Sequence, residues 1–204
     1  MKTKKIVIFA SGTGSNFQAL HQSPLLNDIP AHITALLTDN PKSGALAYAR
    51  LHNIEPVILR PGDYGQYDVY VHRLQEKLAA LQPDIIVLAG YLKKIPDPVI
   101  DQYRGKIINI HPSLLPKYGG KNWYGIRVHQ AVIDNNEKES GCTVHHVTDI
   151  YDGGPVIAQV KVPVSDDDTA ETLAIKVLKQ EHKLYPMVIK QLLTKNQTQT
   201  DKTD

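Results

Sequence analysis

Short apolar runs rich in β-branched residues alternate with helical patterns along the first half of this chain, and this alternation restricts its fold more than any other feature. The strand candidates are residues 6–10, 33–38, 57–59, 85–89 and 107–110. The helix candidates between them are residues 15–22, 44–52, 66–81 and 98–103. Because a helix that follows a strand returns the chain to the start of the next one, this order predicts parallel βαβ units.

The second half of the chain has a different order of predicted elements. After a helical pattern over residues 126–135, strand candidates at residues 142–147 and 156–162 are joined by the turn-rich segment 149–155. Two strands joined in this way predict an antiparallel pair that extends the sheet. We therefore expect an α/β fold: an open, Rossmann-like, mostly parallel sheet with helices on both faces and a C-terminal antiparallel extension.

A last helix is predicted after the acidic triplet that ends at Asp168. Asp168 is a suitable N-cap, and Glu171 three residues later completes a capping-box pattern. The helix should run to about residue 193, with Pro186 as an interruption because proline donates no backbone hydrogen bond. The triplet itself is more typical of a solvated turn than of a metal site.

The composition indicates a single domain over residues 1–194 and a disordered tail over residues 195–204. The 23 basic and 21 acidic side chains leave a formal charge of only +2. So small a net charge argues against nucleic acid as a partner. Small-molecule substrates are expected instead, in a monomer or a homodimer.

The chain has one cysteine, Cys142, which excludes an internal disulfide and a cysteine-rich metal site. Core packing is its expected role, and no metal is expected. The first apolar run, residues 6–10, is too short for a signal peptide or a membrane span, and no later run reaches about 18 apolar residues. We therefore expect a cytoplasmic protein that does not enter a membrane.

The segment 109–116 carries the strongest indication of chemistry. Asn109 and His111 end an apolar strand two residues apart, so their side chains point to one face and can converge on a single carbonyl group. Pro112 ends the strand. Asp152, which precedes two glycines, is the carboxylate best suited to orient the imidazole and raise its pKa. The alternative, that these are ordinary turn residues, stays open at this point.

A second candidate, residues 12–16, lies between the first strand and the first helix, where backbone N–H groups and side-chain donors favour an anion. Phe17 stands where a dinucleotide-binding fingerprint needs a glycine. A phosphate cradle and a tight turn remain the alternatives. Because this loop, residues 91–95 and His111 all follow strands of a parallel sheet, we expect them to share one cleft.

Taken in order, the motifs at residues 12–16, 87–91, 109–116 and 152–155 resemble those of the folate-dependent glycinamide ribonucleotide formyltransferases of purine biosynthesis. The resemblance implies the formyltransferase fold and transfer of a formyl group from 10-formyltetrahydrofolate to the amine of 5'-phosphoribosylglycinamide. The sites that it implies are a catalytic trio, Asn109, His111 and Asp152; a phosphate site, Gly14, Ser15 and Asn16; acceptor contacts, Glu181 and Pro112; and a folate site, Tyr91, Leu92, Lys93, Lys94, Ile95 and Asn109.

One departure from the bacterial pattern of this family concerns the folate. Tyr67 stands where an arginine near the folate is expected, so that contact is either lost or supplied by Arg60 or Arg73.

A second departure concerns the loop that usually brings a histidine to the acceptor. Residues 121–126 look like an insertion there, and His129 or Lys117 is expected to replace the missing contact. Trp123 in this loop either closes over the substrate or anchors the packing. His145 and His146 occupy adjacent strand positions and so face opposite ways, one beside the site and one at the surface.

Three other functions remain to be weighed. Formyltransferases that act on methionyl-tRNA or a sugar nucleotide resemble residues 109–116 but usually carry a further domain and lack the loop at residues 12–16. A formyltetrahydrofolate hydrolase would need an additional regulatory domain. A non-enzymatic nucleotide-binding module would explain the glycine loop but not the polar residues Asn109, His111 and Asp152.

Overall fold

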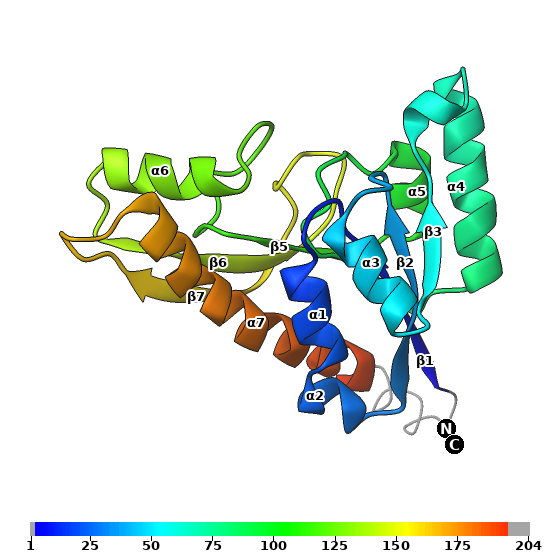
Figure 1. The fold of residues 1–204 in the computed structure, drawn as a ribbon, viewed down its shortest axis with the longest axis horizontal. Coiled ribbons are helices and arrows are strands. Elements are labelled where there is room, and N and C mark those ends of the chain that lie inside the picture. Colours follow the sequence, from blue (N-terminus) through cyan, green and yellow to red (C-terminus); the bar gives the residue numbers. More distant parts are fainter. Residues whose placement is uncertain (1–2, 196–204) are drawn as a thin grey trace.

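The chain folds around one seven-stranded sheet in the order β3-β2-β1-β4-β5-β6-β7, in a computed structural model that describes residues 3–195 (Figure 1). The strands are β1 (Lys4–Phe9), β2 (Ala31–Thr38), β3 (Glu55–Ile58), β4 (Ile85–Leu88), β5 (Ile107–His111), β6 (Glu139–His146) and β7 (Val156–Pro163). β1 to β5 run parallel, whereas β6 is antiparallel to both β5 and β7. The predicted parallel sheet with an antiparallel extension is confirmed.

Helices cover both faces of this sheet, as predicted (Figure 1). The helices are α1 (Ser15–His21), α2 (Pro24–Asn27), α3 (Gly44–Leu51), α4 (Tyr67–Leu81), α5 (Asp97–Gln102), α6 (Ile126–Asp134) and α7 (Ala170–Lys195), with a 3-10 turn η1 (Pro61–Asp63). The short elements α2 and η1 were not predicted, because one turn of helix leaves no periodic apolar pattern in a sequence.

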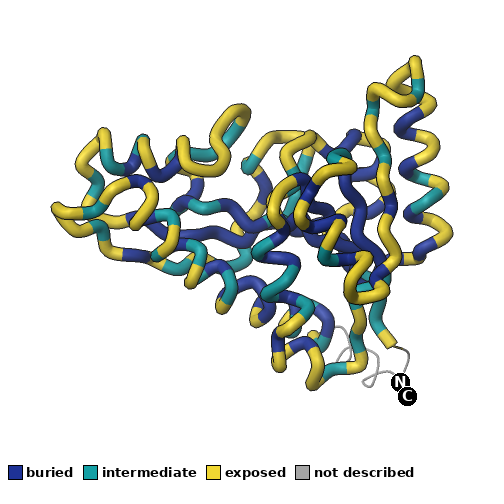
Figure 2. Tube along the Cα trace, in the orientation of Figure 1, coloured by how far each residue is buried: buried dark blue, intermediate teal, exposed yellow. Residues whose placement is uncertain are grey.

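Two hydrophobic clusters lie on opposite faces of the sheet because strand side chains alternate. In β1, Ile6 and Ile8 join the cluster that α1, α3 and α7 cover, whereas Val7 and Phe9 join the cluster that α4 and α5 cover. Figure 2 shows the central strands buried and the loops exposed. Cys142 is a buried member of the first cluster, as predicted.

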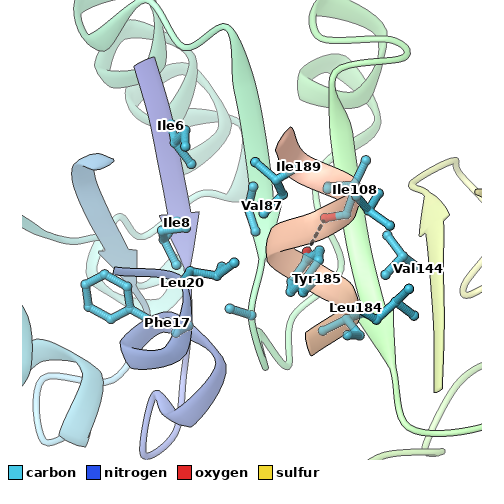
Figure 3. Close-up of a cluster of buried hydrophobic side chains, with 14 of the residues drawn as sticks. Ile6, Ile8, Phe17, Leu20, Val87, Ile108, Val144, Leu184, Tyr185 and Ile189 are labelled. Carbon is cyan, nitrogen blue, oxygen red and sulfur yellow. Dashed lines mark hydrogen bonds between the residues drawn. The ribbon is translucent and has the colours of Figure 1, made fainter. Parts of the chain in front are cut away.

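Helix α7 packs along the first cluster and ties two strands together through Tyr185 (Figure 3). The fully buried Tyr185 hydroxyl donates to the backbone carbonyls of Leu88 and Ile108, at 2.9 and 3.2 Å. The interruption predicted at Pro186 was wrong, because the helix continues across it. Pro186 is itself buried, and its packing offsets the missing backbone hydrogen bond.

The predicted N-cap of α7 was also wrong by one residue. Thr169 and Thr172 cap the helix reciprocally, each backbone N–H donating to the hydroxyl of the other at 3.0 and 3.3 Å. Asp168 instead accepts from Lys176 and from the Ser165 N–H. The helix includes Lys195, which had been predicted in the tail, and the rest of that tail lies outside the described residues.

The loops that follow β1, β4 and β5 lie at one edge of the sheet because these strands are neighbours and run parallel. This edge is where α/β folds of this kind hold their ligands. Within residues 3–195, no helix combines the length and apolar character that a membrane crossing requires.

Candidate active site

Asn109, His111 and Asp152 meet at the carboxyl end of β5. Asn109 and His111 alternate with Ile110 along the strand and therefore share a face. Asp152 reaches them from the loop between β6 and β7: Asp152 Oδ1 lies 3.4 Å from Asn109 Nδ2, and Asp152 Oδ2 lies 3.5 Å from His111 Nδ1. Folding therefore brings the predicted trio together, although 41 to 43 residues separate Asp152 from the other two in sequence.

The electrostatics of His111 differ from the expectation. Burial lowers the pKa of His111 more than the neighbouring Asp152 raises it, so the imidazole is neutral at pH 7 in the absence of ligand. Its Nε2–H donates to the backbone carbonyl of Tyr118 at 2.7 Å, which leaves the Nδ1 lone pair toward Asp152. Asp152 alone therefore does not make His111 a cation.

Asp152 is fixed by its backbone and by three polar neighbours. Its φ angle is 51°, a left-handed conformation that non-glycine residues seldom adopt. The two glycines after it are needed because a Cβ at Gly153 would clash with Ile150 and one at Gly154 with the His146 carbonyl. Burial raises its pKa, but hydrogen bonding to His145, attraction to the protonated form of His111 and the Gly120 N–H together bring that pKa below its usual value. The Gly120 N–H donates to Asp152 Oδ2 at 2.9 Å. Asp152 is therefore ionised at neutral pH.

His145 belongs to the site, although the sequence did not show which of His145 and His146 would face it. It lies directly opposite Asn109 in the antiparallel β5–β6 pair and is buried. His145 Nδ1 lies 2.9 Å from the His146 carbonyl, and its Nε2 lies 3.1 Å from Asn109 Nδ2 and 3.5 Å from Asp152 Oδ1. Cross-strand register, which a sequence does not display, decides that His145 rather than His146 faces the trio.

A cavity of about 600 Å³ opens beside these residues, a size typical of small-molecule sites. The predicted site residues that line it are Asn16, Tyr91, Leu92, Lys93, Lys94, Ile95, Asn109, His111, Pro112, Asp152 and Glu181. Gly14 and Ser15 are not in its lining. The expected single cleft, from the loop after β1 past His111 to the turn after β4, is therefore present with those two exceptions.

A buried polar pair forms one wall of the cavity. Asn16 Nδ2 donates to Glu181 Oε2 at 2.7 Å, while Asn16 Oδ1 is buried without a hydrogen-bond partner in the described chain. Burial raises the pKa of Glu181, and the bond from Asn16 only partly offsets that rise. Gly14 lies two residues before Asn16, and only glycine fits there: its φ is 80°, and a Cβ would lie 2.8 Å from the Cβ of Ala45.

A second wall is the turn after β4, which Ser11 anchors. The Ser11 hydroxyl donates to Asp39 Oδ1 at 2.6 Å and accepts from the Leu92 N–H at 3.1 Å, while the Ser11 N–H donates to the Gly90 carbonyl. The backbone from Gly90 to Leu92 is thereby fixed against the end of β1. Tyr91 packs edge-on against Phe9 in the core below.

The loop over residues 118–125 contributes Gly120 to Gly125 to the cavity lining. Of the two residues expected to replace the missing histidine, His129 lines the cavity, whereas Lys117 forms an ion pair with Glu137 at 2.8 Å and does not line it. Burial and then the charge of His111 lower the pKa of His129 to about 4, and its Nδ1 has no hydrogen-bond partner within residues 3–195. Trp123 lines the cavity and packs edge-on against Tyr118.

Comparison with known proteins shows the family of the chain. A family model described as "Formyl transferase" matches residues 4–189. The chain belongs to the formyl transferase family. It is 42% identical to a chloroplastic phosphoribosylglycinamide formyltransferase of Vigna unguiculata, over 94% of this chain and 62% of that protein. It is 38% identical to the phosphoribosylglycinamide formyltransferase of Bacillus subtilis, over 95% of this chain and 96% of that protein.

Members of the family with known structures share the fold. The crystal structure of phosphoribosylglycinamide formyltransferase from Brucella melitensis superposes with a TM-score of 0.85 at 42% identity, and covers 95% of this chain and 97% of that one. The chain spans less than two thirds of the length of the Vigna protein but nearly all of the Bacillus and Brucella proteins.

Proposed function

We propose that this formyl transferase carries the formyl group of 10-formyltetrahydrofolate to the amine of 5'-phosphoribosylglycinamide, giving the N-formyl product and tetrahydrofolate in purine biosynthesis. The observation that carries the proposal is the meeting of Asn109, His111 and Asp152 in one cavity of ligand size. The names of the relatives, phosphoribosylglycinamide formyltransferase, give the acceptor.

The two walls suggest where each substrate binds. The acceptor would lie against Asn16 and Glu181, where the unpartnered Asn16 Oδ1 and the buried carboxyl group offer hydrogen-bond acceptors for its glycinamide N–H groups. The folate would lie along the turn that Ser11 anchors, where fixed backbone groups and Ile95 combine polar and apolar contacts. Both reacting centres then come within reach of His111.

The chemistry that follows needs no covalent intermediate on the enzyme. The acceptor amine attacks the formyl carbon, and negative charge develops on the formyl oxygen. His111 Nε2–H and the Asn109 amide would stabilise that oxygen, once substrate takes the place of their present partners, Tyr118 and Asp152. The ionised Asp152 would receive the proton that the amine loses, directly or through water. The tetrahedral adduct would then break its bond to the folate N10, which would take up a proton and leave as tetrahydrofolate.

The alternatives differ in what they require. A methionyl-tRNA or sugar-nucleotide formyltransferase would show turnover with another acceptor, and a formyltetrahydrofolate hydrolase would release formate with no acceptor present. A binding module would show no turnover. The protein should be incubated with each substrate alone and with both, while the folate absorbance is followed. Turnover only with both supports the proposal.

Two variants test the assigned residues. His111→Ala and Asp152→Asn should each bind both substrates yet lose about a hundredfold or more in kcat, as expected for loss of transition-state contacts. Asp149→Asn removes a nearby exposed carboxylate that does not line the cavity, and it should keep nearly full activity. Near-normal rates for His111→Ala or Asp152→Asn would remove that residue from the mechanism.

A further inference from the structure

Every polar group of Ser11 is hydrogen-bonded, and the bonds lead to the loops after both strands that flank β1. The Ser11 N–H donates to the Gly90 carbonyl at 3.0 Å, and the Ser11 carbonyl accepts from Asn40 Nδ2 at 3.0 Å. The Ser11 hydroxyl donates to Asp39 Oδ1 at 2.6 Å and accepts from the Leu92 N–H at 3.1 Å. Ser11 therefore joins the ends of β1, β2 and β4, which are neighbours in the sheet.

The orientation of the Ser11 hydroxyl follows from its two partners. A backbone N–H only donates, so the Leu92 N–H needs a lone pair of the Ser11 oxygen. A carboxylate only accepts, so Asp39 takes the single hydroxyl proton. Without a hydrogen-bond acceptor at position 39 the hydroxyl would be free to rotate, and its lone pair would no longer be held toward Leu92.

Asp39 is an unusual residue for a purely structural role. Its side chain is half-buried and forms no ion pair within residues 3–195. Burial raises the pKa of the neighbouring Tyr91 hydroxyl, and the charge of Asp39 raises it further. A partly buried carboxylate without a counter-ion costs stability. Packing does not account for that cost, whereas the bond to Ser11 gives Asp39 a role at the edge of the cavity.

The turn that Ser11 holds is part of the cavity wall. Gly90, Tyr91 and Leu92 line the cavity, whereas Ser11 and Asp39 do not. Asp39 therefore reaches the cavity wall through the Ser11 hydroxyl. A ligand that binds to a turn already fixed in shape does not have to order that turn, which lowers the entropic cost of binding.

We propose that Asp39 is a positioning residue for the formyl donor: it directs the Ser11 hydroxyl, and the Ser11 hydroxyl fixes the turn after β4 in the shape that binds the folate. This inference rests on the proposed function, which places the folate along that turn. The predicted trio lies on β5 and in the loop between β6 and β7. Loss of Asp39 should therefore weaken donor binding and leave the chemical step intact.

The first experiment separates the hydrogen bond of Asp39 from its charge. Asp39→Ala should raise the KM for the formyl donor about three- to tenfold, the range expected for one hydrogen bond, while kcat and the KM for the glycinamide substrate stay within about twofold. Asp39→Asn keeps a side-chain oxygen that can accept the Ser11 proton, so its donor KM should stay within about twofold of wild type.

Binding without turnover gives a second readout. Trp123 is the only tryptophan of the chain and lines the cavity, so its fluorescence can follow a titration with tetrahydrofolate. The dissociation constant should rise in Asp39→Ala by the same factor as the donor KM and should change little in Asp39→Asn. Urea unfolding of each variant shows that the protein under test is folded.

A double-mutant cycle tests whether Asp39 acts through Ser11. Ser11→Ala should raise the donor KM at least as much as Asp39→Ala does. Adding Asp39→Ala to Ser11→Ala should then change the donor KM by less than about twofold, because the hydroxyl that Asp39 directs is already absent. The two single variants reach one bond from its two ends, so either one tests the proposal if the other does not fold.

The matched control is Asp84→Ala. Asp84 is also half-buried and also accepts a hydrogen bond from a neighbouring strand, from the Lys5 N–H at 2.9 Å. It precedes β4, however, at the other end of the sheet, and does not line the cavity. Its loss should leave the donor KM within about twofold of wild type.

Four results would overturn the positioning role. They are an unchanged donor KM in Asp39→Ala, an equal rise in KM for both substrates, an effect of Asp39→Asn as large as that of Asp39→Ala, and additive effects of the Asp39 and Ser11 substitutions. If wild type transfers the formyl group, each of these refutes the role of Asp39 alone. A wild type that binds no folate and shows no formyl transfer refutes the proposed function as well.

Discussion

Replacing His129 with glutamine should make the fold less sensitive to acid. His129 is buried against the cavity, and burial together with the charge of His111 lowers its pKa to about 4 from the ordinary 6.5. Between these two pH values the unfolded chain binds a proton at this position and the folded chain does not. Stability that depends on a neutral His129 is therefore complete above pH 6.5 and is lost as the pH falls toward 4.

The size of the effect follows from the pKa difference. With pKa values of 6.5 unfolded and about 4 folded, proton uptake by the unfolded state costs the fold about 2 kcal/mol at pH 5 and about 3 kcal/mol at pH 4. His129→Gln cannot take up a proton, so the variant should lack this part of the acid sensitivity. At pH 8 both proteins are neutral at this position, which makes that pH the internal control.

The measurement is the free energy of unfolding in urea at pH 8, 6 and 5, followed by circular dichroism. Wild type should lose about 2 kcal/mol more than His129→Gln between pH 8 and pH 5. Three other histidines with lowered pKa values contribute equally to both proteins and cancel; they are His21, His146 and His182. Parallel pH profiles for the two proteins would refute the reasoning.

Two further substitutions test the packing around the site. Tyr185→Phe should lower the free energy of unfolding by about 1–3 kcal/mol, because the carbonyls of Leu88 and Ile108 lose a buried donor. Urea unfolding would measure this loss as a lower midpoint with an unchanged slope. A loss below about 0.5 kcal/mol would show that these carbonyls find other donors. Gly14→Ala should cost about 2 kcal/mol or more, since its φ is 80° and the new Cβ would meet Ala45. A variant with wild-type stability and acceptor affinity would contradict that account.

The sheet and the shared face of Asn109 and His111 were predictable because their causes are local. Short apolar runs rich in β-branched residues, such as Ile85–Leu88, are typical of strands buried on both faces. The two-residue spacing of Asn109 and His111 fixes a shared face in any strand. Asp152 was assigned to the trio from the order of the motifs, because no local pattern shows how close it lies to Asn109 and His111 in space.

What the sequence did not show depends on tertiary contacts. His145 faces Asn109 only because of the β5–β6 register. The net rise in the pKa of His111 that was predicted from Asp152 does not occur, because burial lowers this pKa more than Asp152 raises it, and burial is a property of the whole fold. The N-cap of α7 is Thr169 and not the predicted Asp168, because both residue types can cap a helix and only packing decides between neighbours.

The hydrogen bond between Asn16 and Glu181 joins positions 165 residues apart. During synthesis, the loop that bears Asn16 leaves the ribosome long before α7 exists, so a growing polypeptide has no complete pocket to offer a metabolite. Ligand affinity should appear only when α7 docks, at the final stage of folding. A substrate that then binds would shift the equilibrium toward the finished protein and protect it from proteolysis.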